Sequence, residues 1–127
     1  VWCWGGNASG QVGNGTFVNV DTPTQIASLS NIVDIGGGQL HSCAISNVGV
    51  VSCWGENGDG QLGDGTTVDK ENPVTFGTGY TLPTLTGIKV FAYDVCAVSA
   101  SGAYCSGRHS TADMSSPKIT LGGGGGS

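Results

Sequence analysis

The five cysteines are the residues of this 127-residue chain whose spacing most directly suggests chemistry. Cys43 and Cys53 flank the segment AISNVGVVS, and Cys96 and Cys105 flank the similar segment AVSASGAY. Each pair is typical of two short strands joined by a turn, with the cysteines facing one another. The Cα atoms of directly opposed residues on antiparallel strands lie about 4.5–5.5 Å apart, which is within reach of a disulfide. The spacing therefore predicts disulfides Cys43–Cys53 and Cys96–Cys105, each worth at most about 3 kcal/mol.

Two other uses of these cysteines stay open, namely buried free thiols and a zinc site. Zinc is the weaker alternative, because its thiolate ligands must converge and the two pairs stand a full repeat apart. Cys3 is left over, and the spacing of the other pairs puts its partner before Val1. Cys3 is thus predicted to be unpaired or bonded to another chain. We also expect the chain to begin inside a hairpin, as the C-terminal end of a longer repeat protein.

The segment ENGDGQLGDGTTVD, residues 56–69, carries acidic and amide side chains that suggest a calcium loop. Its spacing does not fit an EF-hand, which needs oxygen ligands at fixed positions and a final bidentate glutamate. No lysine or helix follows the glycines, so a phosphate cradle is weaker still. Asn, Asp and Gly are also the residues that tight turns require. We expect structural turns, with no metal and no cofactor. The sequons at Asn7 and Asn14 fall within the same repeated motif.

No residue stands in a recognisable catalytic arrangement. His41 is predicted to be a hydrogen-bonding strand residue, and no neighbour of His109 in the sequence would make it a base. No strand–turn–helix elbow presents a nucleophilic serine. Trp4 and Trp54 recur at one repeat position, which favours core packing over stacking on a ligand. We therefore expect the protein not to be an enzyme.

The composition favours an all-β protein. There are 24 glycines and 10% charged residues, whereas hydrophobic residues make up 38% of the chain. Glycine weakens helix interiors and suits short strands joined by tight turns. With a net charge of −5 and four Lys and Arg residues, the chain has no basic stripe for nucleic acid. No apolar run is long enough to span a bilayer, so membrane insertion is not expected.

The chain repeats itself about every fifty residues. CWGGNASGQVGNGT at Cys3 matches CWGENGDGQLGDGT at Cys53, an offset of 50 residues. HSCAIS at His41 is echoed by DVCAVS at Asp94, an offset of 53 residues. These matches predict about two and a third units within residues 1–121, before a Gly/Ser linker at 122–127. The predicted units are an incomplete one at 1–15, a full one at about 16–65, and a degenerate one at about 66–121.

The repeated unit is predicted to consist of short strands. NIVDIG, HSCAIS and VVSCWG are β-branched runs bounded by glycine. If Cys43 faces Cys53, then Ile45 faces Val51, which leaves NVG as a three-residue hairpin loop with Gly49 at positive φ.

The repeated motif resembles the regulator of chromosome condensation repeat family. The family pattern of a Trp-Gly pair, a Gly-Gln-Leu-Gly loop and a His-Ser/Thr-X-Ala-Leu strand has matching residues over about 1–107. They are Trp54, Gly55, Gly60, Gln61, Leu62 and Gly63, then His41, Ser42, Ala44 and Ile45, and, in the first copy, Trp4, Gly5, Gly10, Gln11, Val12 and Gly13. The resemblance implies a partial β-propeller with disulfide-stapled hairpins. The paired cysteines look like those of bacterial secreted or surface members.

The resemblance implies several functions, because fold does not settle function. Known members include a nucleotide-exchange factor that binds chromatin, and secreted protein-binding scaffolds such as β-lactamase inhibitors. The residues that carry exchange lie in loops outside the motif, and none can be matched here. Oxidised cysteines and an acidic chain also argue against exchange. What transfers is a rigid disc whose loops contact another macromolecule.

The segment FGTGYTLPTLTG, residues 76–87, replaces a shorter segment of the first unit. It is uncharged and carries Phe76, Tyr80 and Leu82, which makes it a candidate contact surface, with a plain loop as the alternative. We predict a secreted or cell-surface, non-catalytic protein-recognition or scaffold module whose partners are proteins or sister copies. The alternative is a structural subunit of a self-assembling surface oligomer or filament, and an exchange factor or a carbohydrate-binding propeller is less favoured.

Overall fold

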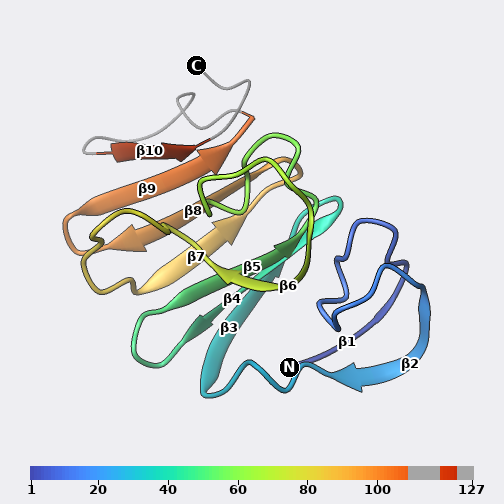
Figure 1. The fold of residues 1–127 in the computed structure, drawn as a ribbon. Coiled ribbons are helices and arrows are strands. Elements are labelled where there is room, and N and C mark those ends of the chain that lie inside the picture. The colour runs from blue at the N-terminus through green and yellow to red at the C-terminus, as the bar shows by residue number, and fades with distance from the viewer. Residues whose placement is uncertain (109–117, 123–127) are drawn as a thin grey trace.

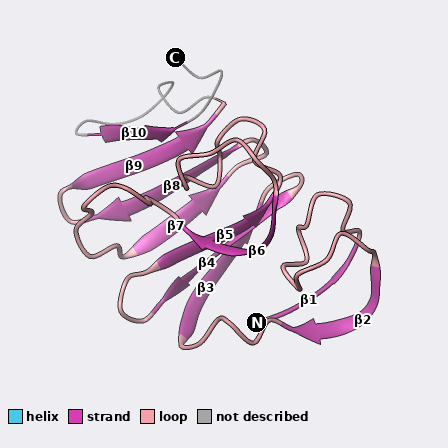
Figure 2. Cartoon of the chain, in the orientation of Figure 1, coloured by secondary structure: helices cyan, strands magenta, loops and turns pink. Residues whose placement is uncertain are grey.

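The computed structural model describes residues 1–108 and 118–122. These residues form ten strands and no helix, as the glycine-rich composition predicts (Figure 2). The strands are β1 (Trp2–Gly5), β2 (Val20–Gln25), β3 (Ile32–Gly37), β4 (His41–Ser46), β5 (Val51–Gly55), β6 (Lys70–Thr75), β7 (Gly87–Val90), β8 (Asp94–Ser99), β9 (Gly102–Gly107) and β10 (Lys118–Gly122).

The strands form three sheets that follow one another along the chain. Figure 1 shows the two-stranded β1–β2 sheet on one side of β3–β4–β5–β6, and the sheet of β7, β8, β9 and β10 on the other. Neighbouring strands are antiparallel, except that β10 runs parallel to β9. Two of the pairings cross the predicted unit boundaries. β2 pairs with β1 across the boundary at about residue 15, and β6 pairs with β5 across the boundary at about residue 65. Predicted linker residue Gly122 ends β10, and 123–127 lie outside the described residues.

The β4–β5 hairpin has the register that the cysteine spacing predicts. Cys43 lies opposite Cys53, and Ile45 lies opposite Val51. The turn is closed by a hydrogen bond of 2.9 Å from the Ser46 amide to the Val50 carbonyl. Gly49 has φ of 80°, and a side chain there would also collide with the Leu85 backbone. The prediction of this hairpin and its glycine turn is confirmed.

Both predicted disulfides are present. Cys43 is bonded to Cys53 and Cys96 to Cys105, with Cα atoms 4.1 Å apart in each pair. Each bond joins the two central strands of a four-stranded sheet. Cys3, at the middle of β1, is a free thiol.

The main hydrophobic core lies between the two four-stranded sheets. It contains Cys43, Ile45, Val51, Cys53, Leu62, Phe76, Leu85, Ile88, Val95 and Ala97. Close approach of the sheets needs a glycine at Gly36, where a Cβ atom would lie 2.6 Å from Cγ2 of Val90. The repeated hydrophobic strand positions are therefore the contact faces between successive sheets.

Candidate functional site

The glycine-rich loop after β5 is organised around one buried side chain, Asn57. Its Nδ2 donates to Oδ1 of Asp64 at 3.0 Å, to the carbonyl and Oγ1 of Thr66 at 3.0 and 3.2 Å, and to the carbonyl of Val68 at 3.0 Å. Its Oδ1 accepts from the Leu62 amide at 3.0 Å. A single amide thus closes the loop from within, which is a structural role.

The first copy of the loop repeats this network around Asn7. Asn7 Nδ2 donates to Asn14 Oδ1 at 3.2 Å and to the carbonyl of Thr16 at 2.8 Å, and its Oδ1 accepts from the Val12 amide at 2.9 Å. The Asn7 side chain is fully buried, so its sequon is inaccessible to a glycosylating enzyme in the folded chain.

Two acidic residues of the second loop, Asp64 and Asp69, have their partners within the loop or directly beside it. Oδ1 of Asp69 accepts a hydrogen bond of 2.8 Å from the backbone amide of Asn57. Oδ2 of Asp64 lies 3.3 Å from Nζ of Lys70. Burial alone would raise the pKa of Asp64, but hydrogen bonds from Thr66, Asn57 and Lys70 outweigh it and hold that pKa below its usual value. Among the described residues, no group of three His, Cys, Asp or Glu side chains is placed to hold a metal ion.

The two repeated tryptophans have different surroundings. Trp54 is 1% exposed, and its Nε1 donates to the Gln11 carbonyl at 2.8 Å. Its ring lies against Gly13, where a Cβ atom would come within 2.7 Å of the ring. Trp4 occupies the equivalent position on β1 but is 58% exposed. The prediction of core packing is therefore confirmed for Trp54 and wrong for Trp4, because no preceding glycine loop lies against Trp4 in the described chain.

The last unit replaces this tryptophan by Ser106, which is also buried. Ser106 Oγ donates to the Gly60 carbonyl. Arg108 then bridges to the preceding loop, with Nη2 3.0 Å from Oδ2 of Asp59 and the guanidinium 3.9 Å from the ring centre of Tyr93. The glycine loop thus receives a contact from the next unit even where the tryptophan is absent.

His41 is buried between the two four-stranded sheets, where its Nε2 lies 3.3 Å from the Asp94 carbonyl. Its Nδ1 has no hydrogen-bond partner. Burial lowers the pKa of His41, and the carbonyl and carboxylate of Asp94 only partly oppose that effect. The side chain is inaccessible to a substrate, which agrees with a structural strand residue. His109 lies outside the described residues.

The low pKa of His41 predicts a pH-dependent stability. The unfolded chain takes up the histidine proton near pH 6.5, whereas the folded chain does so only at a lower pH. The contribution of neutral His41 to the free energy of unfolding should therefore be complete above about pH 6.5. It should decrease as the pH falls toward the pKa of His41 in the folded chain. Denaturant unfolding at about pH 7.5 and 5.5 measures this loss. His41→Gln should flatten the dependence, and an equal loss in that variant would contradict the assignment.

The uncharged segment after β6 joins the β4–β5 turn in one exposed surface. We call it the Tyr80 surface, and it consists of Val50, Tyr80 and Pro83. Tyr80 is half exposed. Of the other residues predicted to contact a partner, Phe76 is buried against Gly63, and Leu82 is partly buried against the core. Phe76 therefore serves packing and is not available at the surface, because its ring fills the space beside the glycine loop.

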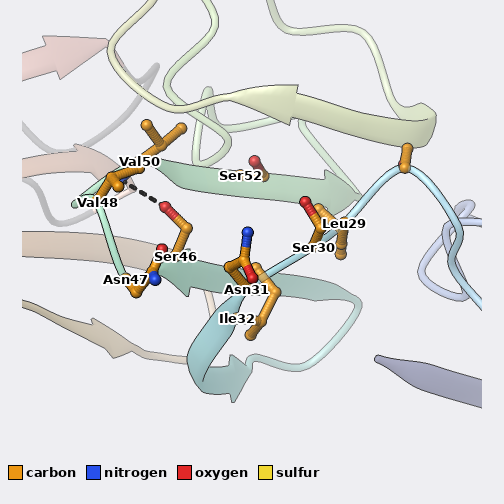
Figure 3. A pocket seen from close by; sticks show the side chains of 10 residues that line it. Leu29, Ser30, Asn31, Ile32, Ser46, Asn47, Val48, Val50 and Ser52 are labelled. Carbon is orange, nitrogen blue, oxygen red and sulfur yellow. Dashed lines mark hydrogen bonds between the residues drawn. The ribbon is translucent and has the colours of Figure 1, made fainter.

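A small pocket of about 250 Å³ lies between the segment before β3 and the β4–β5 turn. In Figure 3, Ser30, Asn31, Ser46 and Ser52 contribute its polar groups, and Ser46 Oγ accepts from the Val50 amide at 3.2 Å. Its lining contains no titratable side chain, so it offers no acid, base or activated nucleophile.

Within residues 1–108 and 118–122, no helix has the length and apolarity that crossing a membrane requires.

Successive four-stranded sheets whose glycine loops pack on their neighbours define a segment of a β-propeller. Residues 1–45 match the family model of the Regulator of chromosome condensation (RCC1) repeat. No curated protein sequence matches the chain. This match to residues 1–45 agrees with the resemblance to that repeat family that the motifs predict.

Three solved structures are similar in fold. Prp20p of Saccharomyces cerevisiae, whose structure was described together with its binding properties to Gsp1p and histones, has a TM-score of 0.71. It is 22% identical, and the similarity covers 84% of this chain and 28% of Prp20p. Yeast RCC1 (Prp20) bound to Kap60 has a TM-score of 0.70 and 22% identity over 83% and 27%. Human WBSCR16 has a TM-score of 0.65 and 24% identity over 76% and 26%. The chain therefore spans about a quarter of the length of each.

Two features of the site escaped the sequence interpretation. The sequence predicts only turns at Asn7 and Asn57, although the recurrence of the two asparagines at an offset of 50 residues is a signal of a shared structural role for their buried amides. Among the described residues, the ring contact between Arg108 and Tyr93 has no counterpart in another unit, so no periodicity of the sequence points to it.

Proposed function

We propose that this RCC1-type segment is a non-catalytic protein-recognition module that works outside the reducing cytosol. A propeller segment of this type fits a protein-interaction module. The observation that carries the proposal is the Tyr80 surface, which is apolar and uncharged on a chain of net charge −5. Uncharged exposed aromatic and aliphatic side chains are typical of the centre of a protein interface.

Two further properties define the proposed role. The two disulfides are suggestive of an extracellular location, because such bonds persist in oxidising compartments. The proposed partner is a protein and not a nucleic acid, since only four Lys and Arg residues are present to neutralise phosphates. Nucleotide exchange is not proposed, because no residue of the chain has been matched to that activity.

Site-specific photo-crosslinking tests the recognition surface. A benzophenone side chain placed at Tyr80 should form adducts with a discrete protein of the extracellular fraction. The matched control is the same group at Phe17, an exposed aromatic residue in the first glycine loop. Adduct formation specific to position 80 is expected. Identical adducts from both positions, or none from position 80, would remove this surface from the account.

A structural subunit of a self-assembling surface oligomer is the second candidate. The observation in its favour is the set of exposed apolar residues Trp2, Trp4 and Ile35 around β1 and β3. Light scattering of the oxidised protein separates the two functions. Self-assembly requires a mass that grows with concentration, whereas the recognition module requires the mass of one chain throughout the range.

A further inference from the structure

A pocket of about 160 Å³ lies at the Tyr80 surface, between the β4–β5 turn and the segment that joins β6 to β7. All of its lining residues fall within residues 49–85, so the second sheet and the segment after it are sufficient to form the pocket. The two walls are packed on one another, since a Cβ atom at Gly49 would lie 2.8 Å from the carbonyl oxygen of Leu85. The pocket is therefore formed before any partner arrives.

The lining of this pocket restricts what it can hold. Val50 and Pro83 are exposed, whereas Val51, Phe76 and Leu85 are buried, so the pocket reaches from the surface to the core. Among the described residues that line it, none is charged. A charged group in such a pocket would lose its water without gaining a partner. An apolar cavity of about 150 Å³ is large enough for a molecule of the size of benzene. The pocket thus suits one uncharged, leucine-sized side chain.

The backbone beside the pocket gives a second observation. Residues 81–84 belong to none of the three sheets. Within the described chain, the backbone amides of Thr81, Leu82 and Thr84 donate to no protein group. Thr81 and Thr84 are exposed, so water satisfies these donors in the free protein. An extended peptide can replace that water, because such peptides are held by main-chain hydrogen bonds while pockets select their side chains.

Other modes of peptide recognition fit this surface less well. A bound helix needs a groove for several anchors spaced over two turns, whereas the pocket has room for one side chain. Addition of a strand to the neighbouring strand β6 is disfavoured, because Pro73 lacks a backbone donor in the middle of that strand. An extended segment along residues 81–84 is the remaining mode.

We propose that the pocket binds an extended segment of the partner protein, which hydrogen-bonds to the backbone of residues 81–84 and inserts one uncharged, leucine-sized side chain between Val50 and Tyr80. The inference rests on the proposed recognition function and deepens it, because it states the chemistry of the partner at the Tyr80 surface. Binding is non-covalent and needs no cofactor.

Nuclear magnetic resonance of the isotope-labelled full chain tests the pocket with a defined probe, the peptide acetyl-Ser-Thr-Leu-Thr-Ser-amide. The backbone amide signals of Thr81, Leu82 and Thr84 and the methyl signals of Val50 should shift together, with a Kd of about 1 mM for so short a peptide. The matched peptide with a central alanine should bind at least about tenfold more weakly, because alanine leaves most of the apolar pocket empty. Equal affinities of the two peptides would overturn the proposal, and so would unshifted amide signals at about 10 mM peptide.

Two variants of the full chain locate the binding. Val50→Asp places a charge in the lining of the pocket and should weaken binding of the leucine peptide at least about tenfold. Val48→Asp is the matched control, because it makes the same change at an exposed valine of the same turn that does not line the pocket. It should leave the affinity unchanged. Equal effects of the two substitutions would show that the peptide does not enter this pocket.

The photo-crosslinking experiment separates this inference from the function on which it rests. Adducts from position 80 that persist undiminished in Val50→Asp would keep the recognition surface and overturn the pocket. Absence of adducts from position 80 would remove the recognition function, whereas the peptide titration reports on the pocket independently of any natural partner. The account requires adducts from position 80 in the parent chain and in Val48→Asp, with a lower yield in Val50→Asp.

Discussion

Replacing Trp54 by alanine should lower the free energy of unfolding by about 3–5 kcal/mol, the usual cost of emptying a buried tryptophan site. The ring is enclosed between β5 and the first glycine loop, and its loss also removes the hydrogen bond to the Gln11 carbonyl. Replacing Trp4 by alanine should cost less than about 1 kcal/mol, because that ring is mostly in water already. The loss in the free energy of unfolding therefore depends on how deeply each tryptophan is buried, and not on its position in the repeat.

Urea unfolding of the two variants measures both costs, with the fitted slope checked for two-state behaviour. Since Trp4 and Trp54 share one motif, the comparison holds the chemistry of the substitution constant. Equal losses from the two substitutions would mean that the first glycine loop does not pack on Trp54 as described.

Replacing Asn57 by alanine should cost at least about 3 kcal/mol. The two N–H groups of the buried amide are shared among four acceptors, and its oxygen accepts from the backbone amide of Leu62. Its removal therefore takes these partners from the carbonyls of Thr66 and Val68 and from the buried Leu62 amide. Each buried group left unsatisfied costs about 1–3 kcal/mol, and water entering the loop recovers part of the sum.

Asn47→Ala is the control, because it removes the same atoms from an asparagine that lies exposed in the β4–β5 turn. It should shift the free energy of unfolding by no more than about 0.5 kcal/mol. Thermal or urea unfolding compares the two variants directly. A loss in Asn57→Ala no greater than that in Asn47→Ala would contradict the role of the buried amide.

The repeat and the hairpins could be predicted because their signals are local. The recurrence of CWG and GQ(L/V)G locates the units, and cysteines nine or ten residues apart fix which strand residues face one another. Register then follows, since Gly49 is the turn residue that accepts positive φ. These features need no knowledge of what lies beside the sheet.

Other features depend on neighbours that the sequence does not name. Trp4 and Trp54 share the CWG motif, yet among the described residues only Trp54 has a glycine loop against its ring. Phe76 lies in a loop-like segment but fills the space beside Gly63. The parallel pairing of β10 with β9 follows no periodicity, because the last unit has lost its motif.

The account rests on disulfide-stapled sheets beside a strand edge that keeps a free thiol. Mass mapping of the purified, unreduced protein after alkylation tests it most directly. We expect Cys43–Cys53 and Cys96–Cys105 links with alkylation at Cys3 alone, as the cysteine pairs of the structure require. Alkylation of all five cysteines, or a link from Cys3 to another cysteine of the same chain, would contradict it.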